Sequence, residues 1–332
     1  MPSREATHAG SWYSSNRATL SSQLDNWLDQ VPASTKCIGS ESATQPPVEL
    51  PSSGARAIIA PHAGYSYSGP AAAWAYKALD LSNAKRIFLL GPSHHFYLSG
   101  CALSKCDTYE TPLGNLKLDK DTIAELHATK AFDKMSQSID EDEHSLEMHL
   151  PYIYKMLERT FGNEASFPAL IPILVGATSA ATEQRFGRLL APYLADPSSI
   201  FIISSDFCHW GTRFRYTYYM PSSGPPRSLR SNERAPTSPP IHESIARVDQ
   251  LCMDAVERGG HAGFLEVLER TGNTVCGRHP IGVVMAAVEV LESEGKAGDG
   301  KGRFRFVRYE RSSDVLGVGD SSVSYCSAFA VF

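Results

Sequence analysis

The chain has 332 residues, is 42% apolar and carries a net charge of −5, so it can bury a large core and lacks the basic block that nucleic acid or an anionic membrane would favour. No apolar run reaches the length of a membrane span and the first ten residues lack an apolar signal core, which argues against membrane insertion. Seven scattered cysteines with no CxxC pair argue against a disulfide framework and favour a reducing cytoplasmic or nuclear setting.

The first eighty residues predict two helices with a surface insertion between them. Leu20, Leu24 and Leu28 recur at helical spacing, which predicts an amphipathic helix over 15–28. The stretch that follows is rich in Pro, Ser, Thr and Gly, and we expect residues 37–54 to form a flexible insertion. Gly69 and Pro70 are expected to start a second helix that runs through 71–79, with Pro70 at its first position.

Three short apolar runs bounded by turn residues predict buried strands. In open α/β sheets, ligands bind outside the carboxyl ends of the strands. Each of the three strands ends in side chains that bind metals or transfer protons, which indicates one shared site in a single large domain. The runs are 57–60, 87–90 and 201–205, and they are followed by His62, by His94 and His95, and by Asp206 and His209.

Strands and helices alternate through the rest of the chain, which favours an α/β layered fold. Residues 220–240 are of low complexity with six prolines, and we expect a flexible loop there. A further loop is expected at the glycine-rich residues 295–302. Helices are expected over 119–130, 151–159, 180–194, 241–257, 261–270 and 281–291, and strands over 170–175, 303–310 and 322–332.

The paired strand ends make His62 and His94 candidate metal ligands, because neutral imidazole is a common ligand for transition metals. Turn histidines that cap backbone groups are the alternative. His95 is a candidate for a residue that orients His94. Cys276 lies close before Pro280, which is expected to open a helix, so it is either a ligand or reactive thiol, or a small buried hydrophobe.

Asp206 and His209 lie three residues apart on the exit from a strand. The carboxylate can orient the imidazole as a general base, either residue can be a metal ligand, or Asp206 can cap a helix beside a surface histidine. Cys208 between them is expected to belong to the core.

The acidic segment 140–149 offers a weaker candidate site. It is either a solvated turn before a helix or a segment in which Glu147 forms a hydrogen bond with a ligand histidine, while His144 shares its helix face. Its spacing is not the HExxH of metalloproteases, and no phosphate loop, dinucleotide motif or nucleophile elbow occurs in the chain. Pocket-lining roles are expected for Tyr65, Tyr67, Arg213 and Arg215.

Seven motifs together resemble the Memo family, named for a mediator of receptor-tyrosine-kinase-driven cell motility. The resemblance runs from about residue 4 to the last residue, and 37–54 and 220–240 are additions to the family core. The motifs are HAGSWY (8–13), APHAGYSYSG (60–69), GPSHH (91–95), DEDEHSLEMHLPY (140–152), SSDFCHWG (204–211), CGRHPIG (276–282) and DSSVSY (320–325).

The resemblance implies a three-layer α/β/α fold similar to the LigB-type class III extradiol dioxygenases, which bind non-haem Fe(II) with two histidines and a carboxylate. Carried over, His62 and His94 match the histidine ligands, Cys276 stands where the carboxylate would be, and His209 beside Asp206 matches the acid–base histidine. A thiolate makes the site softer and also suits copper, so extradiol cleavage does not simply transfer.

Two main functions follow from these expectations. One is a redox protein that binds iron (Fe2+) or copper at His62, His94 and Cys276. The other is a non-enzymatic adaptor whose cleft binds phosphotyrosine peptides of receptor tails, with Arg213, Arg215 and Arg278 supplying positive charge. A metal-dependent hydrolase is a third idea, and it predicts turnover without O₂.

Overall fold

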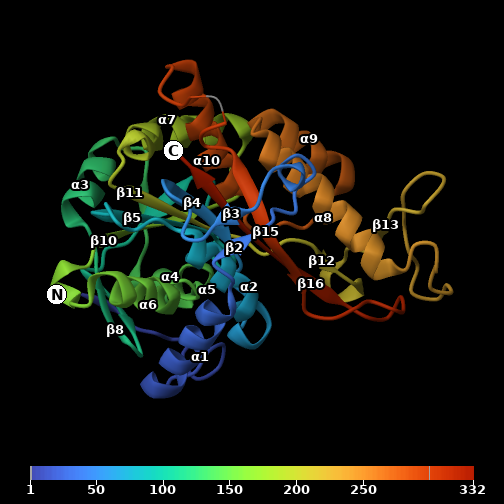
Figure 1. Cartoon of the computed structure of the whole chain (residues 1–332), viewed down its shortest axis with the longest axis horizontal. Coiled ribbons are helices and arrows are strands. Elements are labelled where there is room, and N and C mark those ends of the chain that lie inside the picture. Colours follow the sequence, from blue (N-terminus) through green and yellow to red (C-terminus); the bar gives the residue numbers. More distant parts are fainter. Residues whose placement is uncertain (1, 299) are drawn as a thin grey trace.

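A mixed β-sheet runs through the middle of the molecule (Figure 1). The computed structural model describes residues 2–298 and 300–332, and within them this sheet has nine strands. Their order is β12-β16-β4-β11-β5-β10-β6-β9. The ninth strand, β15, lies off this path and pairs with β16. The bounds are β4 (Ala55–Ala60), β5 (Arg86–Pro92), β6 (Cys101–Leu103), β9 (Asp133–Lys134), β10 (Ala169–Val175), β11 (Ser199–Ser204), β12 (His209–Trp210), β15 (Phe304–Arg311) and β16 (Ser322–Val331).

The four strands β4, β11, β5 and β10 are parallel neighbours and form the centre of the sheet. All residues of β4 and β11 are buried, as are all but the first residue of β5. Continuous apolar runs of this kind are typical of parallel strands that are covered on both faces. The three strands predicted to end in metal-binding or proton-transferring residues are therefore confirmed, and they are adjacent in the sheet.

Helices cover both faces of the sheet, which confirms the predicted three-layer α/β/α fold. On one face α2 packs against β4 and β16, and α1 and α6 pack on α2. On the other face α10 packs against β5 and β11 beside α7, while α8 packs against β15 (Figure 1). The bounds are α1 (Arg17–Gln30), α2 (Tyr65–Ala78), α3 (Lys120–Ala128), α6 (Leu150–Phe161), α7 (Ala180–Ala195), α8 (Ile241–Arg258), α9 (His261–Thr271) and α10 (Arg278–Ser293).

Helix α2 begins earlier than the sequence predicts. It starts at Tyr65, so Pro70 lies inside the helix and does not open it. The first turn is fixed by contacts that do not need an N–H at position 70. The backbone N–H of Tyr65 donates to the Trp12 carbonyl, and that of Ser68 donates to the Gly64 carbonyl.

The two predicted insertions contain short elements of regular secondary structure. In 37–54, a turn of 3-10 helix and the strand β3 (Val48–Glu49) follow β2 (Ser34–Thr35), with which β3 pairs. In 220–240, the strand β14 (Arg227–Ser228) pairs with β13 (Tyr218–Tyr219) in a projection beside α8 (Figure 1). Their flexibility stays a prediction, and position 299 of the predicted loop 295–302 lies outside the described residues.

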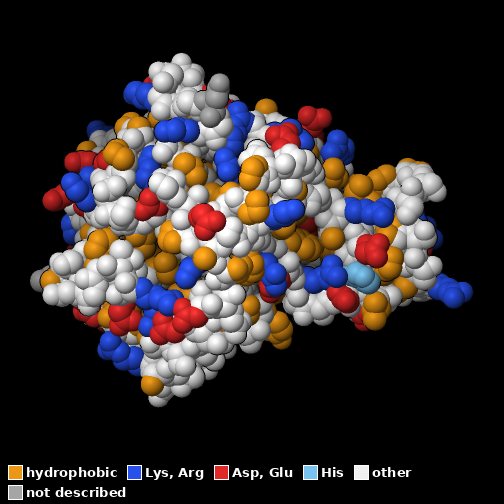
Figure 2. Space-filling model, in the orientation of Figure 1, with side chains coloured by type: hydrophobic (Ala, Val, Ile, Leu, Met, Phe, Trp, Pro, Cys, Tyr) orange, Lys and Arg blue, Asp and Glu red, His pale blue; other side chains and the backbone are white. Residues whose placement is uncertain are grey.

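The surface carries charges of both signs. On the face shown in Figure 2, Lys and Arg side chains are interspersed with Asp and Glu side chains. Among the residues that the structure describes, no helix combines the length and the apolar character needed to cross a membrane.

Candidate metal centre

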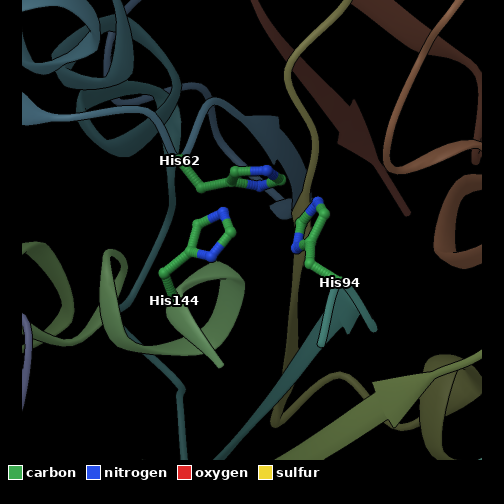
Figure 3. Close-up of side chains that lie close together, drawn as sticks. All are labelled: His62, His94 and His144. Atoms are coloured by element: carbon green, nitrogen blue, oxygen red, sulfur yellow. The ribbon is translucent and has the colours of Figure 1, made fainter. Parts of the chain in front are cut away.

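Three imidazole rings converge where the central strands end (Figure 3). His62 follows β4, His94 follows β5, and His144 begins the one-turn helix α5 (His144–Glu147). One ring nitrogen of each histidine lies within 4.8 Å of those of the other two. Since β4, β11 and β5 are parallel neighbours, their carboxyl ends open on one edge of the sheet, and α5 brings the third ring to that edge.

Hydrogen bonds on the outer sides of two rings fix which nitrogen faces the centre. The Ser204 hydroxyl donates to the Ser145 carbonyl, so at 2.6 Å it accepts a hydrogen bond from Nδ1–H of His62. The Glu143 carboxylate accepts Nδ1–H of His94 at 2.8 Å and the backbone N–H of His94 at 2.6 Å. Both rings therefore carry their free electron pair on Nε2, which is the arrangement found in metal-binding histidines.

The electrostatics keep the imidazoles of His62 and His144 neutral. Burial, and then the neighbouring imidazoles, holds the pKa of His62 well below its usual value. The same two causes lower the pKa of His144 to about 3. Burial alone would raise the pKa of Glu143, but the hydrogen bonds and charge of His94 bring it to about 2. Neutral imidazole is the metal-binding form.

The donor set fits a transition metal. Nδ1 of His144 is buried and has no hydrogen-bond partner, which is rare for a buried polar atom, and the Glu143 carboxylate lies 3.6 Å from it. One ring nitrogen from each of His62, His94 and His144 gives a set of three imidazole donors, and imidazole suits iron, copper, zinc and nickel.

Cys276 lies next to this cluster, on the side of His62. Its Sγ is 3.2 Å from Nε2 of His62, and the backbone N–H of Asp206 points at the sulfur from 3.2 Å. Burial, followed by the charge of Asp206, raises the pKa of the thiol well above its usual value. The structure thus places the predicted thiol beside the predicted histidine, and its role as a metal ligand stays a prediction.

Asp206 lies in the coil that follows β11, and His209 begins β12. Asp206 accepts the backbone N–H of His62 at 2.9 Å, and burial raises the pKa of its carboxyl group, against the opposing influence of His209. Nδ1 of His209 donates to the Phe207 carbonyl at 2.8 Å. The helix-cap alternative for Asp206 is wrong, because the chain continues into β12 and not into a helix. Cys208 is buried, as predicted.

Two cavities meet at the cluster. The larger, of about 670 Å³, is lined by His62, His144 and His209 and by the side chains of Tyr67 and Arg213. The smaller, of about 380 Å³, is lined by Cys276, Arg278 and His279, and His94 lines both. Arg215 does not line the larger cavity. Tyr65 is buried away from it and donates its hydroxyl to the Met148 carbonyl.

The segment 140–149 contributes more than its sequence indicates. Three of its five acidic side chains, those of Asp140, Glu143 and Glu147, are buried, so the solvated-turn alternative is wrong. The carboxylate that binds a clustered histidine is Glu143 and not Glu147, since Glu147 binds His8 at 2.9 Å instead. Sequence reasoning named His144 only as sharing a helix face with Glu147 and missed Glu143 as a site residue. The interleaved apolar residues Leu146 and Met148 were the available signal that this acidic stretch packs inside the protein.

Comparisons with known proteins agree over nearly the whole chain. The family described as Memo-like protein matches residues 4–329. Protein MEMO1 of Homo sapiens is 46% identical over 324 residues, which cover 98% of this chain and 96% of that protein. The Protein memo-1 homolog of Caenorhabditis elegans is 40% identical over 324 residues, which cover 98% of this chain and 81% of that protein. An uncharacterized protein of Escherichia coli K12 with a known crystal structure superposes with a TM-score of 0.46 at 13% identity, over 82% of this chain and 99% of that one.

Proposed function

The chain belongs to the Memo-like family, and from that premise we propose that it is a metal-binding redox protein with a dioxygenase-like site. The convergence of ring nitrogens of His62, His94 and His144 within 4.8 Å, with the Cys276 thiol 3.2 Å from Nε2 of His62, is the observation that carries this proposal. Iron (Fe2+) or copper is the proposed cofactor, because both accept imidazole and copper also accepts thiolate.

In this proposal His62, His94 and Cys276 hold the metal. When bound, iron or copper would supply a change of oxidation state and a position at which O₂ or a small reductant can be held. Ser204 and Glu143 fix the two rings in the tautomer that such a site needs. The thiol sits against Nε2 of His62, so it can join the same ion without a large movement.

His209 and Asp206 are the proposed acid–base and positioning residues. The Phe207 carbonyl holds Nδ1–H of His209, which leaves Nε2 as the basic nitrogen, and the residue lines the larger cavity. A substrate proton in that cavity is therefore within the reach of a positioned base. The Asp206 carboxylate accepts the backbone N–H of His62, and the Asp206 backbone N–H points at Sγ of Cys276. Asp206 therefore helps to fix the positions of two proposed ligands.

Metal content tests the proposal. We would purify the protein without oxygen and measure iron and copper by mass spectrometry in the wild type and in the variants His62→Ala and Cys276→Ala. His127→Ala, on α3 away from the cluster, is the matched control. Stoichiometric metal in wild type and control, and loss in both ligand variants, is expected. A wild type that is empty and takes up neither Fe(II) nor Cu(I) would refute the redox proposal.

A second candidate function is that of an adaptor in receptor signalling and cell motility, which binds phosphotyrosine peptides of receptor tails. The larger cavity favours it, because Arg213 lines that cavity together with Trp12, Tyr67, Ser312 and Ser313. An arginine suits a phosphate group, and the aromatic side chains suit a ring. Titration with a phosphotyrosine peptide separates the two functions. Binding that survives metal removal and His94→Ala but fails in Arg213→Ala supports the adaptor.

The proposed location is the cytoplasm, together with the nucleus. Each of the seven cysteines is a free thiol, as expected in a reducing compartment. Fractionation of cells that produce the protein tests this, and recovery in the secreted fraction would contradict it.

A further inference from the structure

We propose that His144 and Cys276 are alternative third ligands for a single ion held by His62 and His94, so that the centre offers a three-imidazole set and a softer two-imidazole, one-thiolate set. This inference rests on the metal-binding function proposed above and specifies which ions each set takes. His62 and His94 are common to both sets, and the identity of the ion decides whether the imidazole or the thiolate completes the site.

The three-imidazole set is already assembled in the structure. The candidate ligand atoms of His62, His94 and His144 all lie within 4.8 Å of one another, and among the described residues this is the group that meets that criterion. The ring of His144 is stacked on that of His94 with 4.4 Å between centroids, and Trp12 packs on its other side at 4.5 Å. These contacts hold His144 toward its two partners.

The Cys276 thiol approaches the same histidines from another direction. Sγ of Cys276 is 3.2 Å from Nε2 of His62, the nitrogen that the Ser204 contact leaves free. Cys276 lines the smaller cavity whereas His144 lines the larger one, and His94 lines both. The two candidate third ligands therefore approach the shared histidines from different openings.

The two sets differ in the ions that they favour. Thiolate is a soft ligand that selects Cu(I), whereas imidazole suits borderline divalent ions such as Ni(II). To bind, Cys276 releases its proton to bulk water, its hydrogen bond with His62 is lost, and a sulfur–metal bond forms. His144 binds through a neutral imidazole and releases no proton.

Affinity measurements with Ni(II) and Cu(I) test the inference. Each ion would be titrated in competition with a chelator into wild type, His144→Ala, Cys276→Ser and the surface control His127→Ala. His144→Ala should weaken Ni(II) binding about tenfold or more and leave Cu(I) binding within about twofold, and Cys276→Ser should do the reverse. Circular dichroism would establish that each variant is folded.

Thiol labelling gives a second readout that needs no variant. Six of the seven cysteines are at most 5% exposed, whereas Cys276 is partly exposed, so iodoacetamide added to the native protein should label Cys276 first. Saturation with Ni(II) should leave the labelling rate within about twofold, and saturation with Cu(I) should suppress it about tenfold or more, because a metal-bound thiolate is not free to react.

The outcomes separate this inference from the function on which it rests. If wild type binds neither ion, the proposed metal function itself fails. If both ions bind, but Cys276→Ser loses both while His144→Ala loses neither, and both ions protect the thiol, the centre has one ligand set and the inference is overturned. Opposite ion preferences in the two variants, with protection by Cu(I) alone, would support it.

Discussion

Arg4 and Glu147 form an ion pair that is completely shielded from solvent, with 2.8 Å between Nη1 and Oε2. Arg4 belongs to the short strand β1 (Ser3–Arg4) at the start of the chain, and Glu147 ends α5. The same guanidinium also pairs with Asp140 in α4 (Gln137–Asp142) and donates to the Glu143 carbonyl at 3.0 Å. The beginning of the chain thus fixes the segment that presents Glu143 and His144 to the cluster.

The variant Arg4→Met should therefore destabilise the protein by about 3–5 kcal/mol, because it leaves Glu147 as a buried charge that has lost its main partner. Urea unfolding followed by circular dichroism measures this change. Arg308→Met removes the exposed pair with Glu310 and should cost no more than about 1 kcal/mol. Equal losses in the two variants would show that the buried pair does not stabilise the fold.

The Glu143 carboxylate should control metal affinity through His94. Glu143→Gln replaces an acceptor of three N–H groups by an amide that accepts fewer, so His94 loses its fixed tautomer. We expect the affinity for Cu(I) to fall about 10–100-fold. The neighbouring exposed residue provides the control, since Asp142→Asn should leave the affinity unchanged. Unchanged affinity in Glu143→Gln would mean that His94 does not need this support.

Gly277 allows Cys276 to lie against the end of β11. A methyl group at this position would overlap the Ser204 carbonyl and the Ser205 side chain. Gly277→Ala should therefore destabilise the protein by about 1–3 kcal/mol and lower its Cu(I) content. Gly263→Ala, in α9 with open space around the new methyl group, should be neutral or stabilise the protein by up to about 1 kcal/mol. Thermal unfolding and metal analysis of both variants check the pair of predictions.

His149 should make the metal-free protein sensitive to acid. Burial lowers the pKa of His149 to about 3, whereas an unfolded histidine titrates near 6.5. Between these values the unfolded chain binds a proton that the folded chain does not, so the free energy of unfolding falls by about 1.4 kcal/mol per unit as the pH decreases below about 6.5. Above that value the contribution is fully present.

His149→Gln removes this proton uptake and still offers Tyr76 a polar partner. Its unfolding free energy should therefore depend less on pH than that of the wild type, when both are measured by urea unfolding in the presence of a chelator. His95→Gln changes an exposed histidine and serves as the control. Identical slopes in wild type and His149→Gln would contradict the prediction.

The fold and two of the three clustered histidines, His62 and His94, could be predicted because their sequence signals are local. The apolar runs before His62 and His94 are short and continuous, and the rule that ligands lie at the carboxyl ends of parallel strands places both residues at one edge. The position of α2 was predicted less well, because Pro70 suggested a start that the Tyr65 and Gly64 contacts override.

The place of the third histidine, His144, in the cluster could not be predicted in the same way. His144 and Glu143 lie in an acidic segment whose burial depends on Arg4, and nothing in the local pattern connects residues so distant in sequence. Ion pairs between remote segments lack the periodicity that helices and strands show. The role of such a segment becomes visible only when the tertiary structure brings its partner to it.

The place of β16 in the sheet has a consequence for the synthesis of the protein. This strand follows all the others in sequence, yet it lies beside β4, one of the parallel strands next to the candidate metal ligands. Until residues 322–331 have left the ribosome, one edge of β4 has no partner, and exposed strand edges promote association between chains. A premature stop before β16 should therefore yield aggregates and not a shortened soluble form.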